Sequence, residues 1–497
     1  MPSKRLAMAT LLLLIALLVT TATAQIKGVN LGGWLLSEPW ITPSLYDDVS
    51  AEDEWHLCAE LGEDACSQLL RTHWKSFLNQ SDFQAIQRAG LNVVRIPVGY
   101  WAVDVEDYEP YVQGQFSYLT RAVKWAGGLG LGVVISLHGL PGSQNGQENS
   151  GLAGDIEFAS NSSTVERSLK VLSNLTKEFS QDVYGGAVKS IELANEPRTG
   201  SSLPFHDLLE YYQRGSDAVR AENPNVSINI TIHGQSKLNT RPRGSLVIQL
   251  KEKHPHWSQA LQATSSLLRS LVALRIGGMI MLCVAISAEG RGYRRKLTDI
   301  ADPDAFQPLT SWEAHSSNAN TTSLPSQNLS LDTHQYYAYY PRGHLNQDEV
   351  LKSVCEMSKQ LKQKSSKSKL PPTLVGEWSL AQNSSNLPTN YQSNRTEYTS
   401  WLRLFFEAQN AAYAPNGGDQ ASIGWIFWTW RTENDAAAWS YRQGLVEGYI
   451  PANVSDDSLL KYKVDKHGCV KSLAGRTASV SKVLMVVVFI VAVYTYS

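Results

Sequence analysis

Short apolar runs alternate with amphipathic stretches of helical spacing along most of the chain. This alternation is the pattern of repeated βαβ units, which build a parallel sheet. We predict eight strands, which occupy residues 27–32, 92–98, 132–138, 190–195, 227–233, 329–336, 373–378 and 423–430. Eight strands interleaved with helices favour a closed (β/α)8 barrel of the α/β class over an open doubly wound sheet. No glycine-rich phosphate-binding motif follows the first strand, which argues against a dinucleotide-binding fold.

Residues 234–303 interrupt this rhythm directly after the fifth strand. The segment is first basic and rich in serine, then apolar over residues 271–287, and ends in the charged sequence GRGYRRK. The apolar part is long enough to suggest a buried or membrane-spanning helix, although Arg275 interrupts it. A span here would separate the two halves of the barrel. The glycosylation sequons at Asn320, Asn383 and Asn394 argue against that topology.

The N-terminus has the layout of a secretory signal peptide. Lys4 and Arg5 precede an apolar run over residues 11–19, and Ala22 and Ala24 supply the small residues that signal peptidase prefers. The run is too short for a membrane span. We therefore expect residues 1–24 to be removed and the mature chain to begin near Gln25.

The C-terminal residues 471–497 form a second apolar tail. A hydrophobic stretch over residues 483–494 follows a small, polar spacer, which fits a GPI-attachment signal. The candidate attachment residues are Ser472, Ala474 and Gly475, and a short single-pass helix is the alternative. We expect a secreted or cell-surface protein that touches a membrane only through such an anchor.

The composition argues against a nucleic-acid partner and agrees with a secreted protein. The chain has 497 residues and a formal net charge of -2, so it has no basic excess for nucleic-acid binding. Its five cysteines leave one unpaired in an oxidising compartment. Further sequons begin at Asn79, Asn161, Asn174 and Asn453, and their density agrees with secretion.

Polar residues close several of the predicted strands, where the reactive groups of such barrels lie. They are Arg95, His138, Asn195, Glu196, His334, Glu377 and Trp428. A single such Glu is usually solvated or ion-paired, and His138 alone could be a core histidine. Two strands that end in glutamate, with these neighbours, form an unusual combination.

Two facing carboxyl groups are what glycoside hydrolysis requires. We assign Glu196 as the acid/base and Glu377 as the nucleophile. Asn195 would bind the sugar 2-hydroxyl, Arg95 would hold Glu377 ionised, and His334 and Tyr336 would orient the nucleophile or the sugar. The charge of Glu377 should raise the pKa of Glu196. This chemistry needs no cofactor, and His138 and His334 lack sequence partners at metal-ligand spacing.

Seven motifs together resemble the fungal exo-β-1,3-glucanases of glycoside hydrolase family 5. They are GVNLGGWLLSEPWITPSLY, GLNVVRIPVGYWA, LHGLPGSQNGQENSG, ELANEP, DTHQYYAY, VGEWS and GWIFWTWRTEN. The resemblance covers residues 28–469 apart from the interruption, and implies a TIM barrel, retention of configuration and the two glutamate roles given above. It also implies a sugar-binding pocket. Its further residues are Glu38, Trp40, Asn149 and Trp428, with Trp430 as the weaker choice for the floor.

The resemblance implies one disulfide bond, and this chain departs from the family pattern in three places. It implies a Cys355–Cys469 bridge, which leaves Cys58 and Cys66 as a local pair. The family often has phenylalanines where this chain has Gln147 and Tyr339, which weakens the case for linear β-1,3-glucan. The strand-five motif is also split by residues 234–303. We interpret this insertion as a retained intron or gene-model error, with a genuine lid as the alternative; its removal would also remove Cys283.

We therefore expect a domain over residues 25–470 that acts on β-glucan as a monomer and releases glucose from non-reducing ends. A β-1,6-glucanase, another β-glucosidase or a transglycosylase are alternatives within the family. A glucan-binding protein inactivated by its insertion is the alternative from another class.

Overall fold

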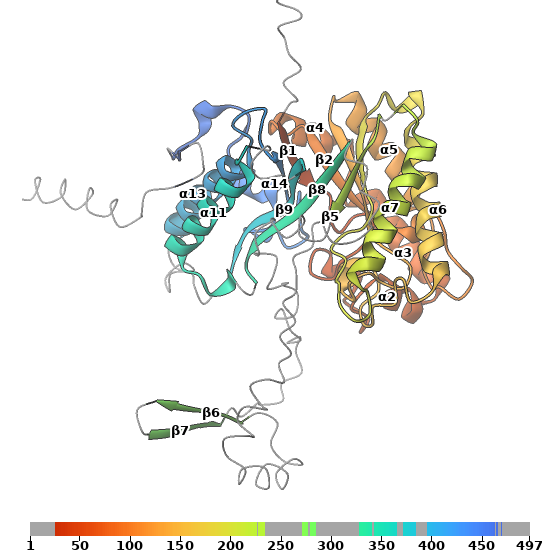
Figure 1. The fold of residues 1–497 in the computed structure, drawn as a ribbon, viewed down its shortest axis with the longest axis horizontal. Coiled ribbons are helices and arrows are strands. Elements are labelled where there is room, and N and C mark those ends of the chain that lie inside the picture. The colour runs from red at the N-terminus through yellow and green to blue at the C-terminus, as the bar shows by residue number, and fades with distance from the viewer. Residues whose placement is uncertain are drawn as a thin grey trace, which may run out of the picture. The chain divides into compact units, whose positions relative to one another are not determined.

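A computed structural model describes residues 25–225, 227–233, 271–276, 279–284, 328–339, 342–364, 371–383, 395–462, 464–465 and 469. Eight parallel strands close into a barrel in the order β1-β10-β9-β8-β5-β4-β3-β2 (Figure 1). They are β1 (Ile26–Asn30), β2 (Val93–Gly99), β3 (Gly132–Gly139), β4 (Val188–Glu192), β5 (Asn229–His233), β8 (Leu329–Tyr337), β9 (Thr373–Gln382) and β10 (Ser422–Phe427). The predicted (β/α)8 barrel is thus confirmed.

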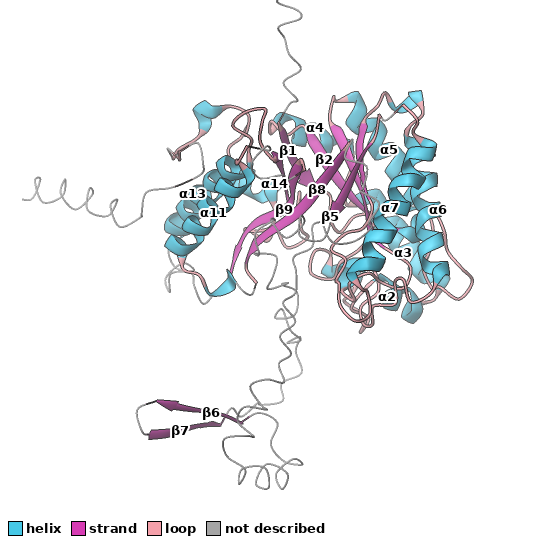
Figure 2. Cartoon of the chain, in the orientation of Figure 1, coloured by secondary structure: helices cyan, strands magenta, loops and turns pink. Residues whose placement is uncertain are grey.

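Helices surround the strands (Figure 2). The α-helices are α2 (Glu54–Leu61), α3 (Glu63–Ser76), α4 (Gln80–Arg88), α5 (Gln115–Gly128), α6 (Ser162–Phe179), α7 (Phe205–Glu222), α11 (Gln347–Leu361), α13 (Arg395–Tyr413) and α14 (Tyr441–Glu447). Short 3-10 helices are η1 (Pro43–Leu45), η2 (Tyr100–Ala102), η3 (Glu148–Ser150), η4 (Asp182–Tyr184), η6 (Arg342–His344) and η8 (Asp457–Leu459). Capping boxes at Asn79 and Asn346 satisfy free amides where α4 and α11 begin.

Several strands end earlier than predicted, and their last residues turn into the loops that build the site. β4 ends at Glu192, three residues before the predicted end. Two backbone bonds continue beyond it, from Leu193 N to Thr231 O and from Asn195 N to Leu137 O. Glu196 then adopts a φ of 43°, a left-handed conformation that is uncommon outside glycine. The backbone is therefore bent at the residue that the sequence singled out as an acid/base.

The chain divides into two compact units, and residues 237–299 form the second. In this unit β6 (Leu271–Ile276) and β7 (Met279–Val284) pair as antiparallel strands. The predicted helix over residues 271–287 is therefore wrong. Gly277 and Gly278 separate the two apolar runs in the sequence, and paired glycines favour a hairpin. None of the helices in the described part of the chain is long and apolar enough to cross a membrane.

β5 and β8 pair directly although residues 234–328 separate them in sequence. Their register runs from Ile230 opposite Leu329 to His233 opposite Asp332. The barrel thus closes without a strand from the second unit.

Two disulfides fasten the first unit. Cys58 and Cys66 join α2 to α3, and Cys355 joins α11 to Cys469 near the end of the described chain. Cys469 thus lies where the resemblance implied. The carboxylate of Glu407 adds a second tie, because it accepts hydrogen bonds from Lys461 N and Tyr462 N.

Candidate active site

Arg95, at the centre of the barrel, is fully buried and holds four polar groups in place. Its guanidinium donates to Glu377 Oε1 at 2.7 Å and to Asn195 Oδ1 at 2.7 Å. It also donates to Glu192 Oε2 at 2.6 Å and to Asn30 Oδ1 at 2.9 Å. A rigid guanidinium fork fixes the directions of its partners. Arg95 therefore sets the positions of side chains from β1, β9 and the β4 end.

Glu196 and Glu377 are brought together at one histidine. His334 Nδ1 lies 2.6 Å from Glu196 Oε1 and 3.3 Å from Glu377 Oε2. One oxygen of each carboxylate and a ring nitrogen of His334 all lie within 4.8 Å of one another. Tyr336 Oη donates to Glu377 Oε2 at 2.7 Å, and Asn149 Nδ2 donates to Glu196 Oε2 at 3.1 Å. Residues far apart in the sequence thus meet at a single pair of carboxylates.

The pKa values of Glu196 and His334 shift in opposite directions. The pKa of Glu196 is lowered, whereas the sequence predicted a raised value. Burial raises the pKa of Glu196, yet the charge and hydrogen bond of His334 outweigh it and bring the pKa down to about 2. Burial lowers the pKa of His334, and Glu377, Asp332 and Glu196 together raise it well above its usual value. The prediction of a raised Glu196 pKa is wrong because it considered only the repulsion from Glu377. In this state His334 carries the proton.

The charge of His334 also acts on the pKa of Glu377, but here burial has the larger effect. Burial raises its pKa, and the nearby His334 and Arg95 lower it without fully offsetting burial. Arg95 therefore favours the ionised form, as expected, but the pKa of Glu377 stays above its ordinary value. The pKa of Glu377 is thus raised and that of Glu196 lowered, which is the reverse of the order expected for a nucleophile and a general acid.

Glu38 and Trp40 lie in the loop after β1. Trp40 Nε1 donates to Glu38 Oε2 at 3.0 Å, whereas Glu38 Oε1 is buried without a hydrogen-bond partner among the described residues. Burial, followed by the nearby charge of Glu148, raises the pKa of Glu38 well above its usual value. Trp40 is 37% exposed and packs on Trp439, with ring centroids 5.1 Å apart. This loop thus presents a carboxyl oxygen and an aromatic face side by side.

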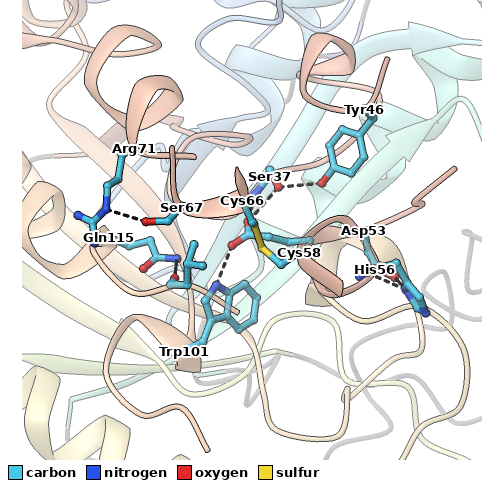
Figure 3. The surroundings of a disulfide bond; sticks show 12 residues. Ser37, Tyr46, Asp53, His56, Cys58, Cys66, Ser67, Arg71, Trp101 and Gln115 are labelled. Atoms are coloured by element: carbon cyan, nitrogen blue, oxygen red, sulfur yellow. Dashed lines mark hydrogen bonds and ion pairs between the residues drawn. A yellow bond between two sulfur atoms is a disulfide. The ribbon is translucent and has the colours of Figure 1, made fainter. Parts of the chain in front are cut away.

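The buried carboxylate of Glu54 holds this loop in place. It accepts from Ser37 N and Ser37 Oγ, and from Trp101 Nε1 at 2.8 Å. Figure 3 shows these surroundings beside the Cys58–Cys66 disulfide, with Ser37 Oγ also bonded to Tyr46 Oη at 2.8 Å. The loop that carries Glu38 is therefore tied to α2 and η2.

His138 and Trp428 stack with centroids 5.7 Å apart and an interplanar angle of 9°. Burial, with Arg95 nearby, lowers the pKa of His138 well below its usual value, so the ring is neutral. Trp428 follows β10 and fills the space against Gly32, whose Cβ position would lie 2.7 Å from the indole. Trp430 instead donates to Asp82 Oδ1 on α4, away from the carboxylate pair.

Gln147 and Tyr339, the two departures, sit at different places. Gln147 precedes η3 and is half-buried. The ring of Tyr339 packs on Tyr336 at 5.9 Å and on Trp439 at 6.2 Å. An aromatic side chain is therefore retained at one of the two positions.

Sequence reasoning missed several residues of this site. Glu192 and Asp332 are buried beside Arg95, and Asp332 Oδ1 accepts from Gly376 N at 2.7 Å. A Cβ at Gly376 would lie 2.1 Å from Asp332 Oδ2, so this strand position has no room for a larger residue. Trp439 also went unnoticed, because it follows no strand. Charged residues inside apolar strand runs were the available signal for Glu192 and Asp332.

Two groups of side chains have the spacing of metal ligands, which the sequence did not anticipate. They are Glu192, His233 and His334, and Glu196, His334 and Glu377. Arg95 and protonated His334 already supply positive charge to these carboxylates.

A family model described as Cellulase (glycosyl hydrolase family 5) matches residues 58–434. The chain is 31% identical to a probable glucan 1,3-beta-glucosidase A of Aspergillus niger, over 87% of this chain and 88% of that protein. It is 30% identical to a glucan 1,3-beta-glucosidase of Schwanniomyces occidentalis, over 86% and 88%.

Among solved structures, the rutinosidase from Aspergillus niger is similar with a TM-score of 0.59 and 20% identity, covering 86% of this chain and 98% of that one. At this identity the likeness shows the fold alone. The sequence matches confirm the resemblance that the seven motifs carried.

Proposed function

The chain belongs to glycosyl hydrolase family 5, and we propose that it is a retaining exo-β-1,3-glucanase that releases glucose from the non-reducing ends of β-glucan. Its relatives from Aspergillus niger and Schwanniomyces occidentalis carry the name glucan 1,3-beta-glucosidase. The observation that carries the proposed mechanism is the approach of Glu196 and Glu377 oxygens to within 4.8 Å. Retaining glycosidases hold their carboxyl groups about 5–5.5 Å apart, whereas inverting enzymes leave room for a water.

In the proposed first step, a Glu377 oxygen bonds to the anomeric carbon while Glu196 gives a proton to the departing glycosidic oxygen. Water then attacks the glycosyl-enzyme, and Glu196 takes a proton from that water. The bond from Arg95 to Glu377 Oε1 and that from Tyr336 to Oε2 fix the carboxylate for attack.

The proton that Glu196 delivers comes from His334. The pair holds one proton, placed on His334 before substrate binds. The 2.6 Å contact from Nδ1 to Glu196 Oε1 allows it to cross as negative charge develops on the leaving oxygen. Glu196 thus acts as an acid although its own pKa is low in the free site.

Asn195 and Glu38 are the proposed sugar-binding groups. Arg95 occupies Asn195 Oδ1, so the amide Nδ2, buried and unpaired among the described residues, is the atom left to donate to the 2-hydroxyl. Glu38 Oε1 is similarly available for hydroxyls of the terminal glucose. Trp40 and Trp428 offer apolar faces to the sugar ring.

We also propose that the enzyme is a secreted or wall-bound monomer. Residues 1–24 would be a cleaved signal peptide, 25–470 the catalytic domain and 471–497 a GPI signal. The terminal segments lie outside the described residues. The two disulfides agree with an oxidising compartment.

Proton NMR of laminarin during digestion tests the function and the mechanism together. We expect β-glucose to appear first, with Glu377→Gln as the inactive control. Early α-glucose would overturn retention, and early release of longer oligosaccharides would overturn exo attack.

A β-1,6-glucan is the second candidate substrate, because Gln147 replaces an aromatic that the family often places on the leaving-group side. The same digestion with a β-1,6-linked glucan decides between the two. A higher kcat/KM on that polymer than on laminarin would reassign the linkage.

A further inference from the structure

The structure points to an N-linked glycan on Asn174 that lies in a groove on the outside of the barrel, an inference that rests on the secretion proposed above. The groove has a volume of about 750 Å³. It lies among α3, η2, α5 and α6, and Asn174 itself lines it. Asn174-Leu175-Thr176 is a glycosylation sequon. A glycan on Asn174 would therefore start at the edge of this groove.

The face of α6 that carries Asn174 is polar near the end of the helix. Lys177 and Glu178 also line the groove and follow Asn174 at the spacings of one helix face, and Gln181 lines it from the segment just after α6. Gln181 Nε2 donates to Glu178 Oε2 at 2.9 Å, and Tyr184 Oη also donates to Glu178. These contacts fix a row of hydrogen-bonding groups beside the acceptor, as sugar hydroxyls require.

Helices α5 and α3 add an aromatic ring and an arginine to the lining of the groove. Phe116 of α5 lines the groove and is half-buried, and its ring packs on Phe179 with centroids 6.0 Å apart. Arg71 of α3 is held by bonds to Ser67 Oγ and Gln113 O. An aromatic face beside polar groups suits the C–H faces and hydroxyls of N-acetylglucosamine.

Other sequons in the described part of the chain begin at Asn79, Asn161, Asn225, Asn229, Asn328, Asn383 and Asn453, and none of these asparagines lines the groove. The side chains of Asn79 and Asn161 cap α4 and α6. Asn453 Oδ1 accepts from Ser455 N and would lie 1.9 Å from a Cβ at Gly90. Asn174 is exposed in the middle of α6 and has no capping role. Asn174 is therefore an exposed acceptor that borders this groove.

The covalent step uses a lipid-linked oligosaccharide pyrophosphate as the donor. Asn174 Nδ2 forms a bond to the anomeric carbon of the first N-acetylglucosamine and loses one proton. The bond from that carbon to the pyrophosphate oxygen breaks, and the lipid pyrophosphate leaves with the electron pair. Transfer precedes folding, so the later burial of Thr176 does not prevent it.

The first test secretes the full chain from a eukaryotic host and examines peptides that contain Asn174 by mass spectrometry. We expect a glycan that endoglycosidase removes, and its loss in Asn174→Gln. An unmodified Asn174 in secreted chain that digests laminarin would overturn this inference and leave the proposed function intact.

The second test measures how fast endoglycosidase trims Asn174 in the folded protein. Phe116→Leu keeps an apolar side chain but removes the aromatic face, and it should speed trimming about three- to tenfold. Tyr108→Leu is the matched control, because Tyr108 is 69% exposed and does not line the groove. Equal rates in all three proteins would overturn the placement of the glycan. So would Phe116-dependent binding of soluble β-glucan to Asn174→Gln protein, which would make the groove a substrate site.

Discussion

His334 Nδ1 lies 2.6 Å from Glu196 Oε1, and the charges of Glu377, Asp332 and Glu196 raise the pKa of His334 well above its usual value. Asp332 Oδ2 lies 3.6 Å from His334 Nε2 on the other side of the ring. The protonated ring is therefore enclosed by carboxylates. In the mechanism we propose, this arrangement lets a buried Glu196 that is ionised at rest still serve as the acid during turnover.

The roles that we propose for Glu196 and Glu377 predict opposite anomers of the product on chemical rescue. Glu196→Ala and Glu377→Ala should each lower kcat by roughly 10³-fold or more. With azide present, Glu196→Ala should give β-glucosyl azide, because azide attacks the glycosyl-enzyme. Glu377→Ala should give α-glucosyl azide by direct displacement. NMR of the products checks both, with Glu166→Ala, an exposed position, as the control. The same anomer from both variants would contradict the assignment.

The His334–Glu196 pair predicts a bounded pH range of stabilisation. The pKa of Glu196 is lowered from 4.5, so its contribution is present above about pH 4.5 and is lost as pH falls toward 2. The pKa of His334 is raised from 6.5, so its contribution is complete below about pH 6.5 and is lost at higher pH. His334→Gln should therefore cost most stability, about 3 kcal/mol, between these limits.

Urea unfolding at several pH values checks this prediction. His206→Gln is the matched control, because His206 is an exposed histidine on α7. A stability difference between wild type and His334→Gln that does not change from pH 3 to pH 8 would show that the loss is one of packing alone.

The close approach of the Trp101 ring should make glycine necessary at position 151. Gly151 has a φ of 80°, and a Cβ there would lie 2.2 Å from the Trp101 ring. Gly151→Ala should destabilise the fold by about 2–4 kcal/mol through overpacking and backbone strain. It should also raise KM, because Trp101 bonds to Glu54, which holds the Glu38 loop. Gly128→Ala, with open space around it, should leave both unchanged.

The eight strands and the glutamate pair could be predicted from sequence because each depends on a local pattern. Apolar runs with turn residues locate strands, and polar residues at their ends locate the catalytic face. Glu196 follows this rule just after the end of β4, whereas Glu377 lies within β9, which continues to Gln382.

Charge balance and irregular loops could not be predicted in the same way. The low pKa of Glu196 depends on His334, which is distant in sequence and approaches only when the barrel closes. Trp439 lies in a loop whose path no periodicity describes. The error over residues 271–287 arose because an apolar run fits a helix or a hairpin equally well by composition.

The last prediction is that residues 237–299 are dispensable for the barrel. They form a separate unit, and β5 pairs with β8 without them. Replacing them with a short Gly/Ser linker should preserve the thermal unfolding midpoint and give laminarin activity at least equal to that of the full chain. It also removes Cys283, so the four remaining cysteines match the two disulfides. Sequencing the transcript across this junction should show a message without the segment. A linker variant that fails to fold, beside a full-length transcript, would instead make the segment a genuine part of the enzyme and favour the lid.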